Sequence, residues 1–187
     1  ICVGLTSIKL KDFINKKWNW VKPKLLSEPG TWNKNWMLFP EKINGKYALL
    51  HSITPTIFIE YLDDLEFKDK KYIKSYYNPF GPETERWDKK VRAAGPPPIK
   101  TKHGWLLLYL AEDQYDPGKY KLGAMILDLK DPTKILLRCK QPILEPCECY
   151  ELNGFKSGIV YALGAVVKDN NLIIYYGAAD SYVCVAS

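Results

Sequence analysis

Short apolar runs separated by polar turns recur along the chain. One run begins at Ile1, and similar runs begin at Ile57, Leu122 and Val183. Each has the length of a β-strand rather than of a helix. The starting points lie 56, 65 and 61 residues apart, which predicts a repeated structural unit of about sixty residues.

A β-hairpin is predicted inside each unit. In the first, Asn44-Gly45 separates two short runs, and Asn-Gly is a strong hairpin signal because both turn positions need a positive φ. The other two hairpins turn at residues 101–104 and 168–171, between apolar and aromatic strands. Helical periodicity is weak, and 13 prolines interrupt most windows that could carry it.

These repeats predict an all-β fold, a β-propeller in which each blade is a small antiparallel sheet. Propeller blades recur at intervals of about 40–50 residues or more. The repeats fall approximately at residues 1–56, 57–121 and 122–182, within a single region that covers residues 1–187. A β-sandwich is the alternative, but its strands would follow one another every ~8–12 residues without a longer period.

Residues 68–97 form a long segment that is rich in aromatic residues and proline. A loop of this length inside a compact domain is usually functional or disordered, and the aromatic content argues against disorder. We expect this segment to cover the mouth of a binding site.

Composition and charge exclude two classes of partner. The net charge is +6, and the densest basic stretch, residues 9–17, is interrupted by Asp12 as on a solvated face. No aromatic-interleaved RNA-binding motif appears. No apolar run approaches the ~20 residues of a membrane span. We therefore expect neither nucleic acid nor a membrane as a partner.

The five cysteines predict reduced thiols. Their number is odd, and Cys147-x-Cys149 is too tight for the usual zinc pair, while His51 and His103 lie far apart in sequence. We therefore expect no metal site and a cytoplasmic protein. Because Ile1 begins a strand-like run without a start methionine, we also expect a fragment that is truncated at both ends.

Several motifs, in a fixed order along the chain, resemble those of one known family. They are residues 34–47 (KNWMLFPEKINGKY), 94–99 (AGPPPI), 104–109 (GWLLLY), 120–124 (YKLGA), 131–134 (DPTK), 142–146 (PILEP) and 175–180 (YYGAAD). They are similar to glycoside hydrolase family 130, whose members have a five-bladed β-propeller. These enzymes act on β-mannosides, by phosphorolysis in many members and by hydrolysis in some. The resemblance implies that this chain is a fragment of about three blades.

The resemblance also implies what the chain lacks. The family's general acid is an aspartate in a Glu-Asp-Pro-Arg motif, which precedes the strand that residues 1–7 resemble and does not occur in this sequence. We expect the proton donor upstream of Ile1, and we expect the fragment to be inactive alone. The catalytic residues within the chain stay unknown. Four acidic residues could act as the catalytic base, although the simpler interpretation is that they are ordinary surface residues. They are Asp113, Glu145, Glu148 and Glu151.

A set of polar residues could bind the substrate. Asp180 follows small residues that let a ligand approach, and its carboxylate can accept hydrogen bonds from sugar hydroxyl groups. The resemblance implies a contact with the mannosyl unit, and a turn aspartate is the alternative. Five further residues are candidates for substrate binding. They could equally be solvated or exposed, or point away from a central channel: Lys34, Asn35, Glu41, His51 and Arg92.

The basic residues that hold phosphate in the family's phosphorylases are replaced here. The family usually has arginine at the position of Ser52, histidine at Leu110, and often lysine near Val91. A phosphate dianion needs several cationic or N–H donors, and Arg92 could compensate for one of the three. The replacements therefore favour glycoside hydrolysis with inversion, in which two carboxyl groups serve as acid and base.

Two alternatives stay open beside hydrolysis. One is a β-mannoside phosphorylase that uses inorganic phosphate as a co-substrate, and the other is a non-catalytic propeller that binds sugar or protein. The expected partner is a β-mannoside or a related oligosaccharide, and no cofactor is expected. A homo-oligomer is left open.

Overall fold

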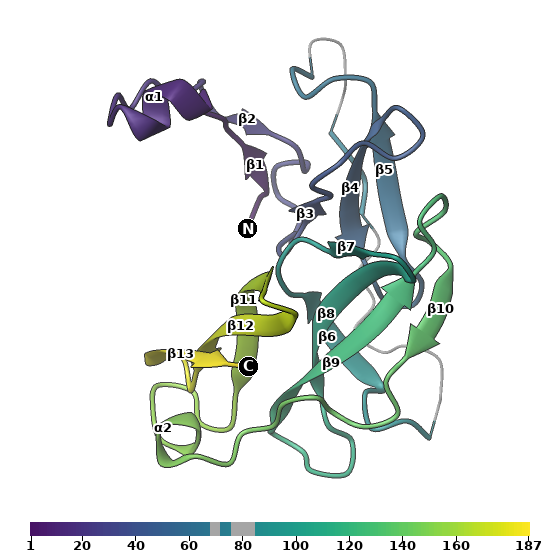
Figure 1. Cartoon of the computed structure of the whole chain (residues 1–187), viewed down its shortest axis with the longest axis vertical. Coiled ribbons are helices and arrows are strands. Elements are labelled where there is room, and N and C mark those ends of the chain that lie inside the picture. Colours follow the sequence, from purple (N-terminus) through teal and green to yellow (C-terminus); the bar gives the residue numbers. More distant parts are fainter. Residues whose placement is uncertain (68–71, 76–84) are drawn as a thin grey trace.

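The computed structural model describes residues 1–67, 72–75 and 85–187, and most of their regular structure is β-sheet (Figure 1). The described helices are short, α1 (Leu10–Ile14) and α2 (Cys149–Leu152). The strands form four antiparallel sheets in these residues. The first sheet pairs β1 (Gly4–Leu5) with β2 (Lys24–Leu25).

The remaining sheets follow in chain order. The second has the order β3 (Met37–Leu38), β4 (Tyr47–Ser52), β5 (Phe58–Leu62). The third has the order β10 (Ile135–Arg138), β9 (Tyr120–Leu127), β8 (Gly104–Glu112), β6 (Lys90–Ala94), and β7 (Ile99–Thr101) also pairs with β8. The fourth has the order β11 (Val160–Lys168), β12 (Asn171–Ala178), β13 (Tyr182–Ala186).

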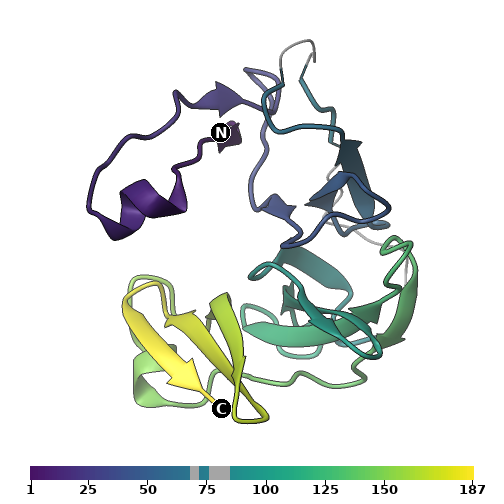
Figure 2. The ribbon, with the colours of Figure 1, turned by 45° about the horizontal axis from the view of Figure 1, so that its top comes forward.

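The sheets stand in an arc around a central space. Figure 2 shows the N-terminal segment, in purple, at one end of this arc and the β11–β13 sheet, in yellow, at the other. This is the arrangement of consecutive propeller blades, and it differs from the two facing layers of a sandwich. The prediction of an all-β propeller is confirmed.

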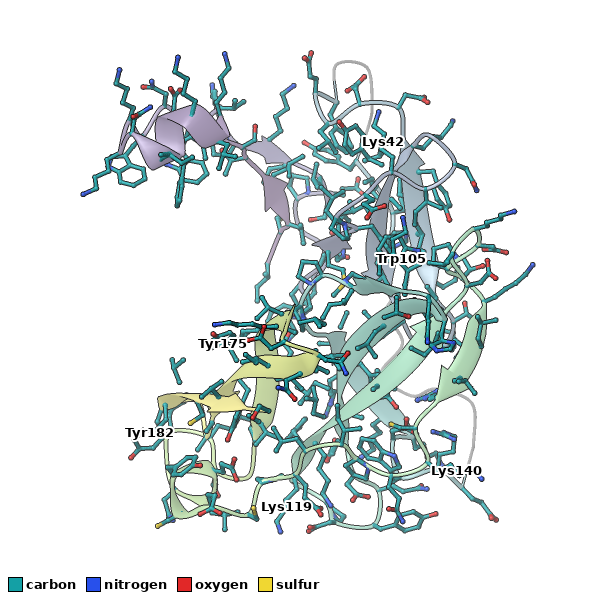
Figure 3. The ribbon with its side chains drawn as sticks, in the orientation of Figure 1. Lys42, Trp105, Lys119, Lys140, Tyr175 and Tyr182 are labelled. Carbon is teal, nitrogen blue, oxygen red and sulfur yellow. The ribbon has the colours of Figure 1, made fainter. Side chains whose placement is uncertain are left out.

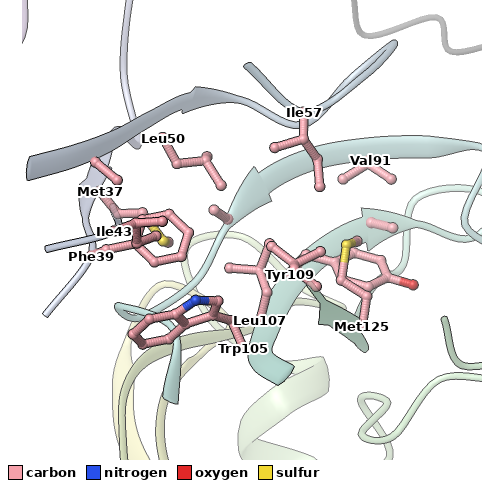
Figure 4. Close-up of a cluster of buried hydrophobic side chains, with 14 of the residues drawn as sticks. Met37, Phe39, Ile43, Leu50, Ile57, Val91, Trp105, Leu107, Tyr109 and Met125 are labelled. Atoms are coloured by element: carbon pink, nitrogen blue, oxygen red, sulfur yellow. The ribbon is translucent and has the colours of Figure 1, made fainter. Parts of the chain in front are cut away.

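Strand β8 is buried on both faces because its sheet has a neighbouring sheet on each side. Leu107 and Tyr109 pack with Phe39 in the core shared with the β3–β5 sheet (Figure 4). Leu108, which points the other way, packs against Ala162 of the β11–β13 sheet. Successive side chains of a strand point to opposite faces, so an uninterrupted apolar run suits a strand between two blades.

The same rule explains β4. Leu50 belongs to the core shared with the β6–β10 sheet, whereas Leu49 packs against Leu26 in a separate cluster toward the N-terminal segment. Both leucines are almost fully buried. One strand therefore packs against both neighbouring blades, with alternate residues facing each of them.

The predicted hairpins are present. Asn44 and Gly45 have φ values of 50° and 80°, and Asp169 and Asn170 have values of 50° and 63° in the β11–β12 turn. Both pairs match the left-handed conformation that tight hairpin turns require. At the β7–β8 turn, a Cβ on Gly104 would lie 2.2 Å from the Leu127 carbonyl oxygen, so glycine is needed there.

The structure differs from the expectation at residues 68–97. This segment contains β6, whose ladder partner is β8, so part of the expected loop is a strand. Its mixture of charged and small residues hides it in the sequence. Residues 68–71 and 76–84 lie outside the described residues. The expectation that this segment covers the mouth of a binding site therefore stays a prediction for them. The expected repeat that begins at residue 57 takes β5 from one sheet and β6–β8 from the next.

Candidate functional site

A cleft lies between the β6–β10 sheet, the β11–β13 sheet with its loops, and the segment that precedes β3. Its volume is about 410 Å³, within the usual range for small-molecule sites. Basic, acidic and aromatic side chains share its walls, which suits a polar ligand that has flat apolar faces. We call it the hub cleft, and it is lined by Trp32, Lys34, Asn35, Arg92, Ala93, Leu110, Tyr120, Lys156, Ile159, Tyr161 and Asp180.

Asp180 is placed by the tight turn between β12 and β13. Asp180 and Ala179 have φ values of 49° and 48°, a conformation that residues with a Cβ atom seldom adopt. The Ala179 N–H donates to the Ile159 carbonyl oxygen, and the Ala179 carbonyl oxygen accepts from the Lys156 N–H, both at 3.0 Å. The loop before β11 therefore holds the turn that brings Asp180 to the hub cleft.

Arg92 reaches the cleft through an irregularity in β6. The register with β8 shifts between Val91 and Ala93, as at a β-bulge, which leaves Arg92 outside the regular pairing. The Val91 side chain is 4% exposed and lies in the core. Arg92 Nη2 donates to Glu112 at 2.9 Å, which orients the guanidinium. On this strand Arg92, not residue 91, supplies positive charge to the cleft.

Two tyrosines contribute to the same cleft. Tyr120 begins β9, and its ring lies under the Lys156 ammonium, with 4.6 Å between Nζ and the ring centroid. Tyr161, on β11, donates its hydroxyl to the Ala94 carbonyl oxygen at 3.0 Å. Burial raises the pKa of Tyr161, so this side chain stays neutral and acts as a hydrogen-bond donor.

A small side pocket of about 30 Å³ adjoins the hub cleft and shares Lys34, Asn35 and Arg92 with it. His51 lines this pocket, and its Nδ1 lies 3.0 Å from the Ser75 hydroxyl oxygen. Burial lowers the pKa of His51, although the charge of a nearby glutamate opposes this shift. The imidazole is therefore neutral at pH 7.

The residues at the family's phosphate positions are uncharged in the cleft walls. Leu110 lines the hub cleft and is 8% exposed. Ser52 lines the side pocket, where its hydroxyl donates to the Thr54 carbonyl oxygen at 2.9 Å. Arg92 lines both spaces, so a positive charge lies near these positions.

The structure brings most of the predicted substrate-binding residues together. Lys34, Asn35, Arg92 and Asp180 line the hub cleft, although their positions span residues 34–180 of the sequence. His51 lies in the adjoining side pocket. Glu41 lies apart from both spaces. It is exposed in the turn between β3 and β4, where it forms an ion pair with Lys100 of β7.

Sequence reasoning missed other residues of the cleft. Trp32 and Tyr161 carry aromatic surface into it, and Tyr120 and Lys156 form one wall. Tyr120 opens the YKLGA motif, which was a usable signal. Lys156 lies in a polar loop with no distinguishing pattern, so only the fold places it.

The acidic residues considered as a base lie in ion pairs or structural hydrogen bonds. Glu151 is 2% exposed and accepts the N–H groups of Cys147 and Glu148, both at 2.8 Å, and the hydroxyl of Tyr176 at 2.7 Å. Asp113 and Glu145 both pair with the buried Lys121. None of these acids lines the hub cleft.

Two further features are absent from residues 1–67, 72–75 and 85–187. No three side chains of His, Cys, Asp or Glu gather there as metal ligands would. No described helix has both the length and the apolarity that crossing a bilayer requires.

The fold and the cleft define the class of protein, a β-propeller with a polar cleft between its blades. Residues 8–187 match the family model of glycoside hydrolase family 130, described as β-1,4-mannooligosaccharide phosphorylase. The chain belongs to glycoside hydrolase family 130, a family of β-mannoside-cleaving enzymes.

Characterised relatives and a solved structure agree with this assignment. The chain is 44% identical over 167 residues to 1,2-β-oligomannan phosphorylase of Thermoanaerobacter sp. strain X514, covering 88% of the chain and 52% of the relative. It is 42% identical over 170 residues to β-1,2-mannobiose phosphorylase of the same organism, covering 90% of the chain and 53% of the relative. The structure of Listeria innocua β-1,2-mannobiose phosphorylase with β-1,2-mannobiose matches with a TM-score of 0.68 and 37% identity, over 87% of this chain and 46% of that one.

The chain spans about half the length of the curated relatives that it matches. The resemblance to the family is therefore established for the blades described above.

Proposed function

We propose that the full-length protein is a β-mannoside phosphorylase and that the hub cleft forms part of its substrate site. The observation that carries the proposal is that Lys34, Arg92 and Lys156 line the same cleft as Asp180. Positive groups suit a phosphate dianion, and a carboxylate suits sugar hydroxyl groups. The names of the relatives, which are phosphorylases, support phosphorolysis over the hydrolysis that Ser52 and Leu110 favour.

The reaction assigns distinct tasks to the two kinds of group. A phosphate oxygen forms a bond to the anomeric carbon while the glycosidic C–O bond breaks, and the leaving oxygen takes up a proton. Basic residues of the cleft would hold the phosphate in line for attack, and Asp180 would orient the mannosyl unit. The proton donor would be a residue of the full-length protein that is not among these 187 residues.

The relatives also suggest the linkage. Both Thermoanaerobacter enzymes carry β-1,2 linkages in their names, whereas the family model is described by β-1,4-linked mannooligosaccharides. We propose a β-1,2-linked mannoside as the preferred substrate, because these relatives share more than two fifths of their aligned residues with the chain.

The test uses the full-length protein with β-1,2-mannobiose and β-1,4-mannobiose, each with and without inorganic phosphate. We expect mannose 1-phosphate from the β-1,2-linked substrate, formed only when phosphate is present. Release of free mannose at the same rate without phosphate would replace the proposal with hydrolysis. Faster turnover of the β-1,4-linked substrate would overturn the linkage alone.

A further inference from the structure

Two cations lie against one aromatic ring in the hub cleft. Arg92 Cζ lies 5.6 Å from the centroid of the Tyr120 ring, and Lys156 Nζ lies 4.6 Å from it. Arg92 Nη2 also donates to the Tyr120 hydroxyl oxygen at 3.3 Å. Cations within about 6 Å of an aromatic centroid are attracted by the ring's quadrupole. Two positive groups from different elements therefore contact the same tyrosine ring.

The two positive groups come from separate parts of the fold. Arg92 belongs to β6, and its guanidinium is oriented by Glu112 of β8 at 2.9 Å. Lys156 belongs to the loop before β11, and its backbone N–H is bonded to the Ala179 carbonyl oxygen at 3.0 Å. The Arg92 side chain and the Lys156 backbone are therefore each held in place by a partner from another element.

An anion in the cleft is attracted by each of the two cations. Arg92 is bonded to Glu112 and to Tyr120, but a guanidinium presents five N–H groups in a fixed fork, so it can bind a further acceptor as well. Lys156 is exposed and adds a compact charge. Asp180 is the acidic residue that lines the cleft, beside the more numerous basic residues.

The chemistry of this arrangement fits a tetrahedral oxyanion. A guanidinium fork can bind two phosphate oxygens, and an ammonium group can bind a third. Phosphate is small compared with a cleft of about 410 Å³, so a sugar unit still fits beside it. The leucine at position 110 faces the same cleft without charge, which leaves the anion to the cations around Tyr120.

We propose that Arg92 and Lys156, which both contact the Tyr120 ring in the hub cleft, form its phosphate-binding end. They take the place of the basic residues that are missing at Ser52 and Leu110. The identity of the anion as phosphate rests on the proposed phosphorylase function. The choice of Arg92 and Lys156 as its binding residues rests on their contacts in the cleft. Lys156 is outside every motif that carries the family resemblance.

The experiment measures binding of inorganic phosphate to the full-length protein by calorimetry, together with KM for phosphate and for the mannoside. Lys156→Met should weaken phosphate binding about tenfold, the effect of losing one charge-assisted contact. Lys156→Arg should restore it, and Arg92→Lys should weaken it by a similar factor. KM for the mannoside should change less than twofold.

Lys140→Met is the matched control, because Lys140 is exposed on the turn after β10 and lines neither pocket (Figure 3). If wild type binds phosphate and all variants bind it equally, the assignment of Arg92 and Lys156 is wrong while phosphorolysis stands. If wild type binds no phosphate and releases only mannose, both proposals are overturned.

Discussion

The carbonyl oxygen of Ala179 lies 2.5 Å from the position that a Cβ atom on Gly154 would occupy. This contact fits the loop before β11 closely against the turn that carries Asp180. The same loop contains Lys156, whose backbone N–H donates to the Ala179 carbonyl oxygen. One close contact between backbones therefore sets the positions of an acidic and a basic residue of the hub cleft.

Replacing Gly154 with alanine should disturb this arrangement. The added methyl group would meet the Ala179 backbone, which must move, and misplacement of a binding group by about 1 Å can cost up to ~100-fold in rate. We expect kcat/KM of the full-length enzyme for its mannoside to fall by at least about tenfold. Gly164→Ala is the control, since a Cβ there would make ordinary contacts at 3.7 Å with Tyr175. Equal kinetics for both variants would contradict the role of Gly154.

Asp180→Asn should weaken binding of the mannoside while leaving the fold intact. The amide keeps the shape of the side chain but loses the charge that strengthens hydrogen bonds from sugar hydroxyl groups, a loss of about 1.5–3 kcal/mol or ~10–150-fold. Asp169→Asn is a matched control, because Asp169 is also an exposed aspartate with positive φ, in the β11–β12 turn away from the cleft. Calorimetry with the mannoside measures both. Unchanged affinity in Asp180→Asn would remove Asp180 from the site.

Glu151→Gln should destabilise the full-length protein by about 1–3 kcal/mol at pH 7, because a glutamine cannot accept all the hydrogen bonds that the buried carboxylate accepts. Denaturant unfolding measures the difference. Although burial acts to raise the pKa of Glu151, hydrogen bonds from the Glu148 and Cys147 backbones and from Tyr176 lower it overall.

A lowered pKa in the folded state fixes the pH dependence of this effect. The stabilising contribution is present above the ordinary glutamate value of 4.5 and is lost as the pH falls through the lower, folded value. The stability difference between wild type and Glu151→Gln should therefore shrink below about pH 4. Glu28→Gln, at an exposed position, serves as the control. A difference that grows on acidification would contradict this account.

His51 should make the protein less stable at mildly acidic pH. Its ring packs against Trp36 and Phe58, at centroid distances of 5.6 and 6.0 Å, and burial lowers its pKa below 6.5. Because the unfolded chain binds the proton more readily, stability falls as the pH drops below about 6.5.

The measurement is the melting temperature between about pH 5 and pH 8. His51→Gln should lose less stability over this range than wild type. His103→Gln, on the exposed β7–β8 turn, should behave as wild type does. If His51→Gln leaves the pH dependence unchanged, groups other than His51 cause the loss of stability.

Much of the architecture was predictable from the sequence. The turn at Asn44-Gly45 and the apolar runs of β4 and β8 are local signals, because turn conformation and strand alternation depend on neighbouring residues. Strand β6 was not predicted. Its small and charged residues carry no strong pattern, and it becomes a strand by pairing with β8.

The sequence alone determined that short strands repeat, where hairpins turn, and which polar residues were candidates for a sugar site. Only the tertiary structure decided that Lys34, Arg92, Lys156 and Asp180 share one cleft, while Glu41 points outward to Lys100. The physical reason is that a site between blades is formed by residues far apart in the chain. Which of them face it depends on bulges, turn geometry and the packing of neighbouring sheets, which no local pattern records.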